Sequence, residues 1–103
     1  MTTSAPAKAT YRVIDNYDHP HGGRILRLRL SRGQALTVKE LKGGTMVATA
    51  PDGSESPIRV EGFALFGGKP SNVRLVRTGR VDVHVRDSAA RDMGPGWTLA
   101  GPA

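Results

Sequence analysis

Apolar and polar residues alternate along several short stretches of the chain, and a period of two is typical of half-buried β-strands. In RILRLRL (24–30), one face carries Leu26, Leu28 and Leu30, and the other carries Ile25, Arg27 and Arg29. In RVDVHV (80–85), the valines at 81, 83 and 85 alternate with Asp82 and His84. Each stretch predicts a strand with an aliphatic side and a wet side, and we expect the aliphatic sides to meet in one closed or nearly closed sheet.

Four further stretches predict strands, at 45–50, 57–66 and, more weakly, 11–17 and 72–77. The first two are joined by Pro-Asp-Gly-Ser (51–54), which is strong turn chemistry because proline presets φ and glycine accepts a positive φ. A helical signal occurs in TVKELKGG, where Thr37 and Glu40 have the spacing of a capping box and two glycines follow. One helical turn cannot cover a sheet, so the pattern favours a small all-β barrel of short antiparallel strands.

A length of 103 residues suits one domain. We expect a flexible leader at 1–10, the β-barrel domain at 11–87 and a Gly/Pro-rich C-terminal tail at 88–103. Trp97 in this tail is a candidate to fold back onto the barrel, because an exposed tryptophan leaves much apolar surface in water. The chain has no cysteine, no apolar run near the ~20 residues that a membrane span needs, and no apolar stretch at its start. We therefore expect a soluble, cytoplasmic protein.

Positive charge is in excess and is unevenly distributed. Fifteen Lys and Arg residues against nine Asp and Glu residues give a formal net charge of +6. Clustered positive charge creates a field that favours polyanions such as RNA. The candidate nucleic-acid contacts are Arg24, Arg27, Arg29, Arg32, Lys69, Arg74, Arg77 and Arg80.

Arg27 and Arg29 are expected to form a short basic row, because alternate residues on one face of a strand lie about 6.6 Å apart. The competing interpretation is an amphipathic strand whose outer face carries charge only to stay soluble. Aromatic residues are few, so any RNA contact should be electrostatic and directed at the backbone. If both arginines touch phosphates, changing them to Gln should flatten the salt dependence of binding by a slope of about 1.4.

Candidate catalytic and metal-binding motifs are incomplete. His19 and His21 are similar to the opening of a cupin metal motif, but no glutamate follows at a short distance, and His84 is the remaining histidine. GFALFGGKPS departs from the phosphate-loop pattern, since Gly68 precedes Lys69 and Pro70 follows it. No Ser-His-Asp arrangement can be argued. We expect no enzyme activity, no metal and no cofactor, with a cupin-like metal enzyme as an outside alternative.

The order of elements resembles a known family. Gly23, Ile25, Leu30 and Gly33 are followed by LKGGTMV, IRVEGFALF and RTGRVDVHV, and together these are similar to the second-domain β-barrel of translational GTPases of the elongation factor Tu type. The resemblance covers roughly residues 11–87. Leu28 stands where the family usually has a second glycine, and the GTPase domain is missing. The resemblance implies a barrel that touches ribosomal RNA or the end of a transfer RNA, without GTP hydrolysis.

The sequence thus predicts a non-catalytic binding module that contacts RNA or a ribonucleoprotein through a basic strand face. The alternative is a protein-interaction or assembly module whose basic face is only a soluble surface. Salt dependence of RNA binding would separate these two functions. The oligomeric state is left open.

Overall fold

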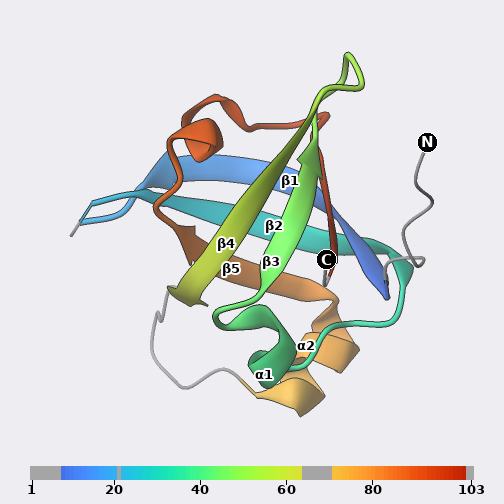
Figure 1. Cartoon of the computed structure of the whole chain (residues 1–103). Coiled ribbons are helices and arrows are strands. Elements are labelled where there is room, and N and C mark those ends of the chain that lie inside the picture. Colours follow the sequence, from blue (N-terminus) through green and yellow to red (C-terminus); the bar gives the residue numbers. More distant parts are fainter. Residues whose placement is uncertain (1–7, 21, 64–70, 102–103) are drawn as a thin grey trace.

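The computed structural model describes residues 8–20, 22–63 and 71–101, and these form a closed antiparallel β-barrel (Figure 1). Its strands are β1 (Ala9–Asp18), β2 (Arg24–Gly33), β3 (Thr45–Thr49), β4 (Glu55–Phe63), β5 (Arg80–Val85) and β6 (Thr98–Gly101). They follow the order β1-β2-β5-β4-β3-β6 around the barrel, and β6 pairs with β1 to close it. The prediction of a small all-β barrel is confirmed.

The barrel interior is filled by the residues that the alternation assigned to one face. Leu26 lies opposite Val83 and Leu28 opposite Val81 where β2 and β5 pair. The first three of these side chains are fully buried, and Val81 is 7% exposed. Among the described residues no charged residue is buried, and Tyr11 is the only buried side chain that carries a hydroxyl, so the core is held mainly by apolar contact.

Ile25 is buried, although the alternation assigned it to the solvent-exposed face of β2. Its side chain lies on the outer face, yet it is only 3% exposed. Its cross-strand neighbours are Tyr17 on β1 and His84 on β5. This end of the outer face is therefore apolar and aromatic, although the arginines follow directly along the same strand.

The predicted capping box is present at α1 (Val38–Leu41). The Thr37 hydroxyl accepts a hydrogen bond from the Glu40 amide (3.2 Å), and the Glu40 carboxylate accepts one from the Thr37 amide (2.9 Å). Leu41 at the end of this turn is buried in the core. The preceding loop is anchored by Tyr11, whose buried hydroxyl accepts a hydrogen bond from the Leu36 amide at 2.9 Å.

The prediction of a strand at 72–77 is wrong, because this segment belongs to α2 (Asn72–Thr78). The Ser71 side chain caps the helix by accepting a hydrogen bond from the Arg74 amide, and Gly79 ends it in the left-handed conformation at φ +65°. Leu75 is buried, but Val73 and Val76 are 76% and 70% exposed. The local caps thus decide the structure, although the valines and the leucine fit a strand pattern equally well.

The barrel also extends past the expected boundary at residue 87. The segment expected to be a tail contains η1 (Ser88–Asp92) and β6, which lies between β1 and β3. Trp97 packs against the core as proposed, and its carbonyl accepts a hydrogen bond from the Val13 amide at 3.0 Å. Four residues are enough for β6 because it pairs through backbone hydrogen bonds with a strand on each side. The short sequence TLAG does not predict this pairing.

The predicted hairpin between β3 and β4 is present. The Ala50 amide donates to the Ser54 carbonyl at 2.8 Å across the turn, and Thr49 lies opposite Glu55. None of the helices in the described part of the chain has the length and apolar character that a membrane crossing requires.

Candidate nucleic-acid interface

The outer face of β1, β2 and β5 carries three arginines side by side. Arg12 on β1 lies opposite Arg29 on β2, and Arg29 lies opposite Arg80 on β5. All three are exposed, whereas Tyr11, Val13, Leu28 and Val81 beside them along the strands are buried, so the arginine side chains point outward. We call Arg12, Arg29 and Arg80 the arginine row.

No acidic side chain of the described residues pairs with the arginine row. The ion pairs among these residues involve other cations, namely Lys8, Arg24, Arg27 and Arg59. Neighbouring strands lie about 4.8 Å apart, so the three positive charges start from backbone positions within about 10 Å. Like charges directly opposite one another destabilise a sheet. The arginine row is therefore an unfavourable arrangement for stability and a favourable one for an anion.

Arg32 extends this positive surface. Arg32 lies opposite Thr10 on β1, and Thr10 precedes Arg12 by two residues. The side chains of Arg32 and Thr10 both face outward. The pairing slips by one residue here, so that Ser31 is extra, and its hydroxyl donates to the Thr10 carbonyl at 3.1 Å. Arg32 forms no ion pair with the described residues, and it adds a fourth available cation to the same face.

Arg27 lies on the same face but is already paired. The next set of opposed residues is Asp15, Arg27 and Asp82, which we call the mixed row. Arg27 donates from Nε to Asp82 Oδ1 at 3.2 Å and from Nη2 to Asp82 Oδ2 at 3.5 Å. The hydrogen bond to Asp82 raises the pKa of the Arg27 guanidinium. Its guanidinium also lies 5.9 Å from the centre of the Tyr17 ring.

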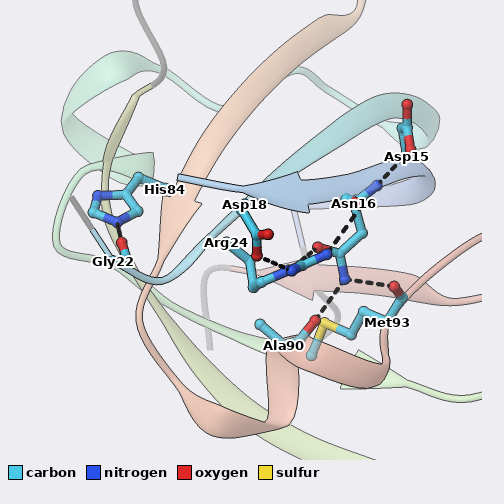
Figure 2. Close-up of polar contacts among 8 residues, drawn as sticks. All are labelled: Asp15, Asn16, Asp18, Gly22, Arg24, His84, Ala90 and Met93. Carbon is cyan, nitrogen blue, oxygen red and sulfur yellow. Dashed lines mark hydrogen bonds and ion pairs between the residues drawn. The ribbon is translucent and has the colours of Figure 1, made fainter. Parts of the chain in front are cut away.

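Arg24 has a structural position at one end of the barrel (Figure 2). Its Nε donates to Asn16 Oδ1 at 2.6 Å, and its Nη1 forms an ion pair with Asp18. The side-chain nitrogen Nδ2 of Asn16 in turn donates to the carbonyls of Ala90 and Met93, both at 2.6 Å. Arg24 thus orients the side chain that holds η1 against the barrel.

Arg74 and Arg77 lie on α2 and not on a strand. Both are exposed, and at a spacing of three residues they share one side of the helix. The helix leads directly into β5, where the Arg80 amide donates to the Thr78 hydroxyl at 3.2 Å. They are near the arginine row in sequence but belong to another surface element. Lys69 lies outside the described residues.

The fold therefore divides the predicted contacts. Arg29 and Arg80 come together, with Arg32 beside them, while Arg27 and Arg24 are engaged by aspartates. Arg12 was not predicted. The signal that could have found it is its position between Tyr11 and Val13, which is typical of an outward side chain on a strand. Its neighbours on β2 and β5 depend on strand order and register, which no short motif reveals.

The two histidines that the structure describes also come together. The rings of His19 and His84 stack with centroids 3.8 Å apart. His84 Nε2 lies 2.8 Å from the Gly22 carbonyl oxygen (Figure 2). Stacking turns ring faces, not nitrogen lone pairs, toward one another, which does not suit a shared metal. Among the described residues no three metal-ligating side chains gather, and His21 lies outside them. Most of the GFALFGGKPS segment, residues 64–70, also lies outside.

No protein-family model matches the chain, and neither does any curated protein sequence. The arrangement of side chains on the barrel is thus the basis for a functional argument.

Proposed function

We propose that this barrel is a non-catalytic binding module that contacts the phosphate backbone of RNA through the arginine row and Arg32. The proposal is carried by one observation: three arginines from three adjacent strands stand abreast with no acidic partner among the described residues. Guanidinium groups match phosphate oxygens in geometry and stay charged at every physiological pH. A phosphate would relieve the repulsion between them.

Two further considerations support RNA as the polyanion. The chain carries a net charge of +6, which attracts nucleic acid from a distance. The order of its elements resembles the second-domain barrel of translational GTPases, in which the barrel touches RNA. This resemblance fits a cytoplasmic protein that forms part of a ribonucleoprotein.

The test is a titration with short single-stranded RNA at several salt concentrations. Each phosphate contact on a single strand contributes about −0.7 to the slope of log K against log salt. Replacing Arg12, Arg29 and Arg80 by Gln should therefore flatten the slope by about 2.1. The matched control replaces Arg59, Arg86 and Arg91, which are also exposed, and removes the same net charge from other positions.

The control triple variant should keep the parent slope, because a contact depends on where the guanidinium lies. Absence of RNA binding by the parent at low salt would refute the proposal. Equal losses of slope in the two triple variants would show that only net charge matters and that the arginine row is not a site.

Protein interaction is the second candidate, and one observation favours it. Val73 and Val76 are the most exposed large hydrophobic residues of the described chain, and their spacing places them on one side of α2. If α2 binds a protein, changing both valines to Ser should abolish that contact and leave the RNA slope unchanged.

A further inference from the structure

We propose that the arginine row binds a single RNA backbone, and that Asp82, by holding Arg27, keeps this backbone out of the mixed row. This inference rests on the proposed function and adds to it a substrate class and a residue that sets the boundary of the site.

Arg27 and Arg29 differ in what surrounds them, although both are exposed and both point outward from β2. Arg29 has arginines on both neighbouring strands, whereas Arg27 has Asp15 and Asp82. The Asp82 carboxylate receives two N–H contacts from Arg27 and, at 3.4 Å, the hydroxyl of Tyr17. Asp82 is therefore fixed from two strands, and its side chain is only 18% exposed.

A phosphate that approached Arg27 would compete with this carboxylate. To bind the phosphate, the guanidinium would leave Asp82 and place an unpaired negative charge beside the new ligand. Contact and repulsion would then largely cancel. The exposed Asp15 on the other flank adds a second negative charge, so the mixed row has a formal charge of −1 while the arginine row has +3.

The negative mixed row and the positive arginine row together limit a bound anion to a narrow strip of surface that runs across β1, β2 and β5. The arginine row spans about 10 Å over three strands, with Arg32 on one side and the mixed row on the other. Double-stranded RNA is recognised through phosphates on successive grooves, which requires positive charge over a wider area. A single backbone fits this strip, and its bases remain free of sequence-specific contact.

The decisive variant is Asp82→Asn, which keeps the shape of the side chain and removes its charge. Arg27 then becomes available, so the slope for a single-stranded oligouridylate of about 12 nucleotides should become steeper by about 0.7. In the parent background, Arg27→Gln should leave the slope unchanged. The double variant Asp82→Asn/Arg27→Gln should return to the parent slope, which assigns the gain to Arg27.

A second arm competes the bound oligouridylate with a duplex RNA of equal phosphate concentration. The duplex should compete several-fold less well than unlabelled oligouridylate. If Asp82→Asn keeps the parent slope, or the duplex competes equally, the inference is overturned while the proposed function stands. If the parent binds no RNA at low salt, both are overturned.

Discussion

Two neighbouring rows on the same three strands show how cross-strand register decides whether an arginine is paired with an aspartate or left available to a ligand. The arginine row places Arg12, Arg29 and Arg80 abreast, and the mixed row places Arg27 between Asp15 and Asp82. Along β2 the two central arginines are only two residues apart and both are exposed. What differs is the residue that each neighbouring strand brings opposite them.

The difference has an energetic sign. Opposite charges facing each other across strands stabilise a sheet by about 0.2–1 kcal/mol per pair, and like charges facing each other destabilise it. The mixed row thus supports the fold at β2–β5, while the arginine row opposes it. A stable arginine row without a ligand is possible only because the core beneath it stabilises the strands.

The largest predicted effect concerns that core. Leu28 lies between Arg27 and Arg29 in sequence, but it points into the barrel and is fully buried. Leu28→Asp would bury an unpaired charge and should lower the free energy of unfolding by about 3 kcal/mol or more. Arg29→Asp adds the same side chain one position later, on the outer face, where it would meet two arginines.

Urea unfolding of both variants measures this contrast between the two faces of β2. Arg29→Asp should be at least as stable as the parent, because it replaces repulsion by attraction. Similar losses in the two variants would mean that the faces are assigned wrongly.

A smaller loss is expected at Tyr11, which precedes Arg12 in sequence and whose hydroxyl holds the loop before α1. Tyr11→Phe leaves the buried Leu36 amide without its acceptor and should cost about 1–3 kcal/mol. Burial raises the pKa of the Tyr11 hydroxyl above its ordinary value near 10.

The pH dependence follows from this shift. The neutral hydroxyl is favoured in the folded protein, so its contribution is complete below pH 10 and is lost as pH rises through the folded pKa. Thermal melts from pH 8 to pH 11 should therefore show the parent losing stability faster than Tyr11→Phe at the alkaline end. If the melting temperatures of the parent and of Tyr11→Phe fell in parallel with pH, the Tyr11 hydroxyl would not be the cause of the alkaline loss of stability.

The smallest effects test the two rows directly. Arg29→Gln should raise the free energy of unfolding by about 0.2–1 kcal/mol, because it removes repulsion on both sides. Arg27→Gln should lower it by a similar amount, at most about 1 kcal/mol, because an exposed ion pair is lost. Both differences should shrink in high salt, which screens surface charges. A change of the same sign in the free energy of unfolding of both variants would contradict the opposite roles of Arg27 and Arg29.

Much of the fold could be predicted from local patterns. The alternation in 24–30 and 80–85 identified the interior residues Leu26, Leu28, Val83 and Val85, and the capping box identified α1. The errors occurred where short segments carry little information. For residues 72–77, Ser71 and Gly79 as helix caps outweighed an ambiguous apolar pattern. For β6, pairing with β1 and β3 was decisive, and four residues could not signal it.

The candidate site was less predictable than the fold. Outward arginines could be recognised on each strand, but their availability depends on which strands are neighbours and on register. Pairing of β1 with β2 slips between Val13 and Asp15, and this slip places Asp15, not Ile14, beside Arg27. A charge count along β2 treats Arg27 and Arg29 as equivalent, although their surroundings are opposite.

If the arginine row is the RNA site, Arg29, and not Arg27, contacts the RNA backbone. The most direct measurement is the salt slope of single-stranded RNA binding for the parent, Arg29→Gln and Arg27→Gln, with each variant losing one positive charge. We expect Arg29→Gln to flatten the slope by about 0.7 and Arg27→Gln to keep the parent value. Equal slopes for the two variants, or a loss confined to Arg27→Gln, would contradict this expectation.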